Sequence, residues 1–152
     1  MRVLGIDVGL RHTGYAVIDG MTLVVCGVYS SDDKLSFSLR LKELYDSLKL
    51  LIQKEVPEVA VYETVFYGQN ARTLSILAHV RGVLLLAAQE SEVKIKEYTP
   101  TEIKKAVSGN GRASKYQVHG MVERLLGMKL SPSSDIGDAV ACALCYVLRN
   151  GR

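Results

Sequence analysis

The sequence lacks the usual marks of an exported or membrane-spanning protein. No apolar stretch approaches the roughly 20 residues that a helix needs to cross a bilayer. The first residues alternate between apolar and polar, as in a strand, and do not follow the layout of a signal peptide. We therefore expect a cytoplasmic protein.

Cysteine is also scarce, and its count is odd. Three residues, Cys26, Cys142 and Cys145, are a poor basis for a disulfide framework in a chain with no export signal. Cys142 and Cys145 form a C-x-x-C pair within the apolar run AVACALCYVL, but no second pair or suitably spaced histidine pair completes a zinc site. We interpret them as core residues.

The length of 152 residues predicts one domain, and the formal net charge of +3 is unevenly spread. The first half carries 8 Lys/Arg against 9 Asp/Glu, and the second half 11 against 7. Residues 103–122 contain four cations and no acidic residue: Lys104, Lys105, Arg112 and Lys115. This segment is a candidate surface for phosphates, and a merely solvated face is the alternative.

The periodicity of apolar residues predicts an α/β order of elements. Strands are expected at residues 2–8, 13–19, 22–29, 59–63 and 93–98, and helices at 32–54, 70–89, 101–107, 114–126 and 135–148. The order βββαβαβααα predicts a central mixed sheet of five strands, the first three antiparallel, flanked by helices.

Four acidic residues interrupt apolar runs: Asp7, Glu63, Asp135 and Asp138. Asp7 and Glu63 end two predicted strands, and the two aspartates share one face at a helix start. Two full charges ~4 Å apart cost roughly 4 kcal/mol at an effective dielectric of 20. Converging carboxylates would therefore take up protons or bind a cation. Helix capping remains an alternative for Asp135.

Such a set of oxygen ligands suits Mg²⁺, with Mn²⁺ as a substitute, better than zinc. One or two such ions can assist the hydrolysis of a nucleic acid strand. We expect the histidines at 12, 79 and 119 to be structural or surface residues, with His119 in the basic segment the one to test.

The helix expected at residues 70–89 is apolar or small nearly all round, which in a soluble domain indicates burial on two sides. One side should cover the sheet, and the other should contact a second copy of the chain. The residues predicted at this homodimer interface are Leu74, Ala78, Arg81, Gly82 and Leu85. The alternative is a helix wholly buried within one subunit.

Four segments together carry a resemblance to a known family: GIDVGLRHTGYAV, ETVFYGQNARTLSILAHVRG, YTPTEIKKAVSGNGRASKYQV and SSDIGDAVACAL. Over nearly its whole length the chain resembles the RuvC family of Holliday-junction resolvases, in the RNase H and retroviral integrase superfamily. The resemblance implies an RNase H-like fold and a Mg²⁺-dependent homodimer. Such an enzyme would cut four-way DNA junctions by paired symmetric nicks and would cooperate with the RuvA–RuvB branch-migration complex.

The resemblance also implies roles for single residues. The four acidic residues match the metal ligands of the family, and Phe66 matches an aromatic residue that stacks on an unpaired base. Lys104 and Lys115 match residues that contact the cleaved backbone. Gly137 departs from the pattern, because many relatives have alanine there.

Other readings of the sequence stay open. A nuclease of the same fold could act on RNA, and GIDVGLRHTG also resembles the start of a sugar-kinase ATP-binding lobe. A junction-binding module without catalysis is a further alternative, which would be indicated if the four acidic residues did not cluster.

Overall fold

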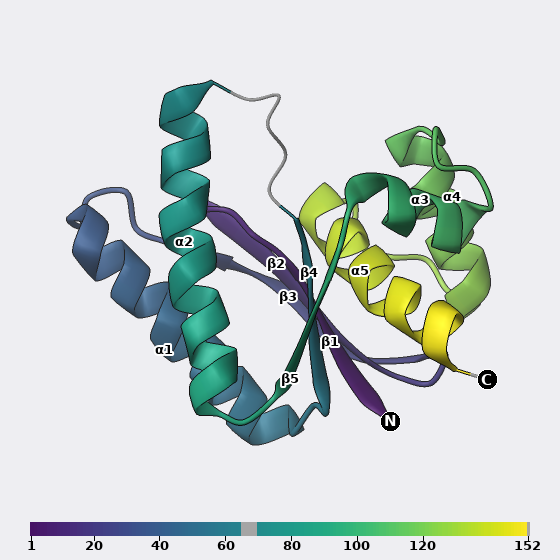
Figure 1. Cartoon of the computed structure of the whole chain (residues 1–152), viewed down its shortest axis with the longest axis horizontal. Helices are drawn as coiled ribbons and strands as arrows, with labels where there is room; N and C mark the ends of the chain where they lie inside the picture. The colour runs from purple at the N-terminus through teal and green to yellow at the C-terminus, as the bar shows by residue number, and fades with distance from the viewer. Residues whose placement is uncertain (65–69, 152) are drawn as a thin grey trace.

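The computed structural model describes residues 1–64 and 70–151. Its elements are β1 (Arg2–Asp7), β2 (His12–Asp19), β3 (Thr22–Ser30), α1 (Phe37–Glu55), β4 (Val59–Glu63), α2 (Ala71–Glu90), β5 (Lys94–Tyr98), α3 (Pro100–Ser108), α4 (Lys115–Leu126) and α5 (Ser134–Asn150). Figure 1 shows their arrangement. The types and order of the elements are those predicted from the sequence.

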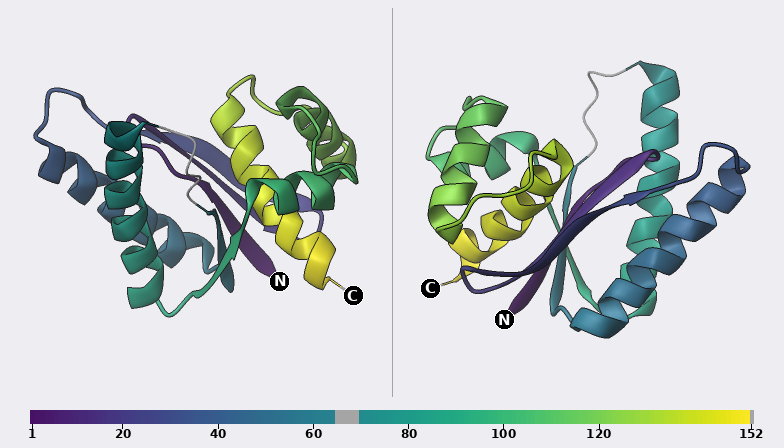
Figure 2. Two further views of the ribbon diagram at one scale, coloured as in Figure 1. Left: turned by 45° about the horizontal axis from the view of Figure 1, so that its top comes forward. Right: turned by 180° about the vertical axis from the view of Figure 1, so that it is seen from behind.

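The strands of the described part form one mixed sheet in the order β3-β2-β1-β4-β5. The first three strands pair antiparallel, whereas β4 runs parallel to β1 and β5 parallel to β4. Helices α1 and α2 cover one face, and α3, α4 and α5 lie on the other (Figures 1 and 2). This arrangement confirms the predicted fold class.

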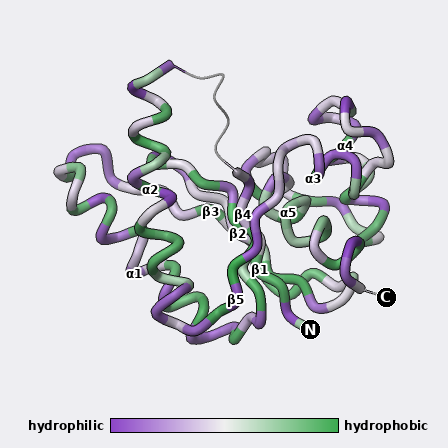
Figure 3. Tube along the Cα trace, viewed as in Figure 1, coloured by the Kyte–Doolittle hydropathy of each residue, from purple (hydrophilic) through white to green (hydrophobic). Residues whose placement is uncertain are grey.

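Successive side chains along each strand point to opposite faces of the sheet, which divides the core into two layers. On β1, Leu4 and Ile6 pack with the α1 and α2 side, whereas Val3 packs with the α5 side. On β4, Tyr62 belongs to the first layer and Val61 to the second. Hydrophobic segments run through the sheet in Figure 3, and the outer turns of α1 are hydrophilic. The alternation decides which strand residues face α5.

Helix α1 begins later than its apolar periodicity predicted. It starts at Phe37, and the Ser36 side chain accepts a hydrogen bond from the Leu39 amide as its cap. Before it, the Asp32 side chain accepts from the Lys34 amide at 2.9 Å, which closes a local turn. Serine and aspartate favour such caps and turns over helix interiors, so the expected start near residue 32 is corrected to residue 37.

Helix α2 corrects the expectation about long apolar stretches. Within the described residues, its 20-residue length and mean hydropathy of 1.4 would suit a membrane span by length and composition, with 28% of that window buried. Core helices of soluble proteins pass the same test. Arg81 in its second half is ion-paired, and the helix packs beside α1.

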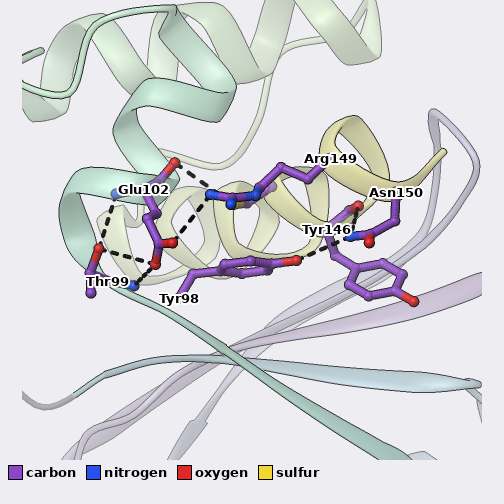
Figure 4. Close-up of polar contacts among 7 residues, drawn as sticks. Tyr98, Thr99, Glu102, Tyr146, Arg149 and Asn150 are labelled. Atoms are coloured by element: carbon purple, nitrogen blue, oxygen red, sulfur yellow. Dashed lines mark hydrogen bonds and ion pairs between the residues drawn. The ribbon is translucent and has the colours of Figure 1, made fainter. Parts of the chain in front are cut away.

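Polar contacts fasten α3 to the end of α5 (Figure 4). Glu102 and Thr99 form a reciprocal capping box at the start of α3. The other Glu102 oxygen lies 3.3 Å from the Arg149 guanidinium, which also lies over the Tyr98 ring. Asn150 donates to the Tyr98 hydroxyl at 3.1 Å. The C-terminal end of α5 is thus tied to β5 and α3.

Candidate active site

Two of the four acidic side chains come from neighbouring parallel strands. Ile6 is paired with Tyr62, so the next residues, Asp7 and Glu63, end β1 and β4 at the same edge of the sheet. Ile6 and Tyr62 face the α1 and α2 layer, and the alternation therefore directs both carboxylates toward α5. Both residues are half-buried.

Helix α5 carries the other two acidic residues and lies very close to the sheet. A Cβ at Gly5 would lie 1.9 Å from the Ala139 carbonyl oxygen, and one at Gly14 would lie 2.2 Å from the Asp135 carbonyl oxygen. Gly14 is paired with Asp7 in the sheet. The bare backbone of these two glycines therefore lets the start of α5 reach the end of β1.

The electrostatics show that the four carboxyl groups influence one another. Burial raises the pKa of Asp7 to about 8, together with a hydrogen bond to Asp135 and repulsion from Asp138, Asp135 and Glu63. Burial also raises the pKa of Glu63, and repulsion from Asp138 adds to it. The structure thus brings together residues that lie up to 131 positions apart.

Basic side chains lie around this cluster. Lys115 Nζ lies 2.8 Å from one Asp138 oxygen, and His119 Nε2 lies 2.8 Å from the other. Lys104 and Lys115 both counteract the rise in the pKa of Glu63. Two cations of the basic segment, Lys104 and Lys115, thus lie near the carboxyl groups.

The donor chemistry of the cluster suits a divalent cation. Its donors are carboxylate oxygens, the ligands that Mg²⁺ and Mn²⁺ prefer. Burial raises the pKa of Asp7, and the neighbouring carboxyl groups add to this rise; a cation would offset the repulsion between them. In residues 1–64 and 70–151, no three His, Cys, Asp or Glu side chains are already spaced to hold an ion. Both Asp138 oxygens are engaged by α4, so the donor chemistry fits, and the side chains would have to rearrange.

The remaining cations predicted to contact DNA lie farther out. Lys105 and Arg112 are exposed. Arg112 lies in the loop between α3 and α4, where the Asn110 side chain accepts a hydrogen bond from the Arg112 amide at 2.9 Å. Phe66 lies outside the described residues.

Arg81 was predicted at the dimer interface, and this prediction is wrong. The residue is only 9% exposed, and its guanidinium donates to the Glu63 carbonyl oxygen at 2.6 Å. A second nitrogen lies 2.7 Å from a Glu97 oxygen. Arg81 therefore turns inward and holds the strand end that carries Glu63.

The other residues predicted at the interface lie on the outer side of α2. Ala78 and Gly82 are exposed, and Leu74 and Leu85 are half-buried. Leu86, which was not among the predicted residues, is 50% exposed. This stripe of small and apolar surface on α2 is called the outer stripe below; it comprises Ala78, Gly82 and Leu86. It remains a predicted interface.

An open hollow of about 1060 Å³ lies along α4, beside the carboxylate cluster. His119 lines it, as does Tyr116, which is 87% exposed. His119 also contacts Asp138 of the cluster through its Nε2 atom. The hollow is therefore next to the candidate site.

Sequence reasoning assigned no role in the site to four residues that shape it: Gly5, Gly14, Arg81 and His119. The two glycines sit in the segment GIDVGLRHTG, with Gly5 two residues before Asp7 on the same strand face. That spacing was a usable signal for a close approach. The partners of Arg81 and His119 are distant in sequence, so no local pattern could have identified them.

Comparison with known proteins places these features in a family. The family described as "Crossover junction endodeoxyribonuclease RuvC" matches residues 3–146. The protein of that name from Bordetella parapertussis is 45% identical over 150 residues, which cover 96% of this chain and 82% of that protein.

Solved structures agree with the sequence comparison. The structure of Thermus thermophilus RuvC superimposes with a TM-score of 0.91 at 28% identity, covering 99% of this chain and 97% of that one. The same protein in complex with a Holliday junction substrate also gives 0.91, with coverage of 98% and 94%.

The mixed sheet, its helical layers and the carboxylates at one sheet edge define an α/β protein of the RNase H-like class. The chain belongs to the RuvC family of crossover junction endodeoxyribonucleases.

Proposed function

We propose that this protein is a Mg²⁺-dependent endonuclease that resolves four-way DNA junctions by paired symmetric nicks, leaving 5′-phosphate and 3′-hydroxyl ends. The observation that carries the proposal is the convergence of Glu63, Asp135 and Asp138 on the largely buried carboxyl group of Asp7, in a chain of this family. The Thermus thermophilus relative, solved with a Holliday junction substrate, supports the choice of DNA.

Asp7, Glu63, Asp135 and Asp138 would hold the divalent cation. A bound Mg²⁺ supplies a Lewis acid that polarises the scissile phosphate and favours deprotonation of the attacking water. The protein contributes a partly buried cluster of carboxyl groups for it, and burial, together with repulsion between these groups, raises the pKa values of Asp7 and Glu63.

The basic residues of α3, α4 and their loop would bind the DNA backbone. Lys104 and Lys115 lie close enough to Glu63 to influence its pKa, so a strand bound by them would pass the carboxylates. Lys105 and Arg112 extend the positive surface outward. Phosphate contacts of this kind position a strand without reading its sequence.

We further propose a homodimer formed through the outer stripe. A two-fold enzyme would place two sites on a two-fold junction, as paired nicks require. Ala78 and Gly82 would let a second helix approach closely, and Leu86 would become buried. Cytoplasmic location and cooperation with RuvA and RuvB are proposed on the family alone.

The test is cleavage of a synthetic mobile four-way junction with Mg²⁺, Ca²⁺ or chelator, using end-labelled strands. We expect symmetric nicks with Mg²⁺ and none with chelator. Asp7→Asn should lower the nicking rate by orders of magnitude while junction binding persists, because the backbone-binding cations remain. Normal nicking by Asp7→Asn would contradict the assigned site, and a preference for an RNA–DNA hybrid would contradict the assigned substrate.

A further inference from the structure

Helix α4 contacts both oxygens of the Asp138 carboxylate. Nε2 of His119 lies 2.8 Å from Oδ1, and Nζ of Lys115 lies 2.8 Å from Oδ2. The two partners differ in freedom: the Lys115 side chain is 60% exposed and the His119 side chain 24%. The lysine can swing away into solvent, whereas the imidazole ring is confined.

Gly137 accounts for the position of the ring. A Cβ at this residue would lie 2.8 Å from Cε1 and Nε2 of His119, closer than real Cβ contacts come. Gly137 is buried inside α5, where glycine costs roughly 1 kcal/mol relative to alanine. The His119 ring therefore occupies the space that a side chain at 137 would fill, and from there it reaches the next residue, Asp138.

We propose that His119 is a positioning residue for Asp138 and that Gly137 provides the room for it. The proposal rests on the proposed function, because Asp138 is one of the carboxylates expected to hold the cation. A hydrogen bond that fixes one carboxylate oxygen leaves the other in a defined direction, and groups that orient ligands in this way raise metal affinity.

Lys115 is the partner that we expect to leave Asp138 when a cation and DNA bind at the site. Its ammonium charge repels a cation that approaches the same carboxylate, and its side chain is exposed enough to turn toward a DNA phosphate. His119, held against Gly137, keeps its contact with Oδ1.

The experiment measures Mn²⁺ binding to the DNA-free protein by the electron paramagnetic resonance signal of the free ion, so that cleavage does not enter. His119→Ala should weaken Mn²⁺ binding about tenfold, at the lower end of the effect of groups that orient metal ligands. His119→Gln should recover most of the affinity, because its amide can donate to the same oxygen. His12→Ala is the matched control: the His12 ring contacts Ser30, and this variant should bind Mn²⁺ as the parent does.

Gly137→Ala tests the same contact without removing the histidine. The added methyl displaces the ring, and alanine favours the helix, so the variant should fold and lose a similar factor in affinity. The double variant His119→Ala with Gly137→Ala should bind no more weakly than His119→Ala alone. Additive losses, or unchanged affinity in either folded single variant, would overturn the proposal.

Asp138→Asn separates failure of this inference from failure of the proposed function. If Asp138→Asn binds Mn²⁺ as the parent does, Asp138 is not a ligand and both proposals fail at this residue. If it loses affinity and His119→Ala does not, the metal site stands and only the role of His119 is lost.

Discussion

Helices α2 and α5 are both apolar, yet they contact the rest of the molecule in different ways. Every residue of α5 from Ile136 to Tyr146 is buried except Asp138, which is half-buried. Helix α2 is buried at Val80, Arg81, Leu84, Ala87 and Ala88, and its outer stripe is exposed. Burial on nearly all sides fixes the position of α5 within the chain, whereas α2 retains exposed apolar surface.

The contrast predicts opposite effects of adding one methyl group to each region. Gly5→Ala would force Cβ against the Ala139 carbonyl, and we expect a loss of about 3 kcal/mol or more in the free energy of unfolding, measured by urea denaturation. A Cβ at Gly82 would have no neighbouring atom within 4 Å in the described structure. Gly82→Ala should therefore raise the free energy of unfolding by about 0.5–1 kcal/mol. If the two variants were equally stable, the close packing of α5 against Gly5 would be contradicted.

Arg81 marks the inward side of α2. Arg81→Met keeps the aliphatic stem but loses the contacts with the Glu63 carbonyl and Glu97, and we expect unfolding to become easier by about 2 kcal/mol. Arg72→Met, at an exposed position of the same helix, is the control and should change stability by less than about 0.5 kcal/mol. Similar effects of the two substitutions would contradict a stabilising role for the buried contacts of Arg81.

The outer side of α2 can be tested separately from its packing. Gly82→Arg should weaken dimerisation at least about tenfold, or about 1.4 kcal/mol, because a charged side chain would have to be buried between two helices. Analytical ultracentrifugation across a concentration series measures the effect. Gly120→Arg, on the open side of α4, should leave the dimer intact. A parent protein that is monomeric at micromolar concentration would contradict the interface.

The smallest effect is expected where α5 reaches the surface. Arg149→Ala removes an ion pair with Glu102 whose side chains are both more than 40% exposed, so stability should fall by no more than about 1 kcal/mol. Thermal unfolding measures it. A loss of 2 kcal/mol or more would show that the contacts in Figure 4 act as one cooperative network.

The sequence was sufficient for the element order, because strands and amphipathic helices carry their own periodicity. It also singled out Asp7, Glu63, Asp135 and Asp138, since a charge within an apolar run is a local signal. Resemblance to the family then supplied the substrate class that no spacing could give.

The failures have physical reasons. Helix α2 is apolar nearly all round, so its periodicity does not show which side faces inward, and Arg81 was placed on the wrong side. The start of α1 was extended because Leu35 continues the apolar spacing, although Ser36 caps the helix. The contact between His119 and Asp138 depends on how α4 docks on α5, which is a tertiary outcome.

The docking of the last helix on the first strand has a consequence for biosynthesis. Asp7 leaves the ribosome early, but Asp135 and Asp138 reach it only after α5 has been translated and has settled over Gly5 and Gly14. A nascent polypeptide that has not reached α5 therefore lacks two of the four carboxyl groups of the candidate site. Assembly of the candidate site therefore waits until α5 has been translated and has packed on the sheet.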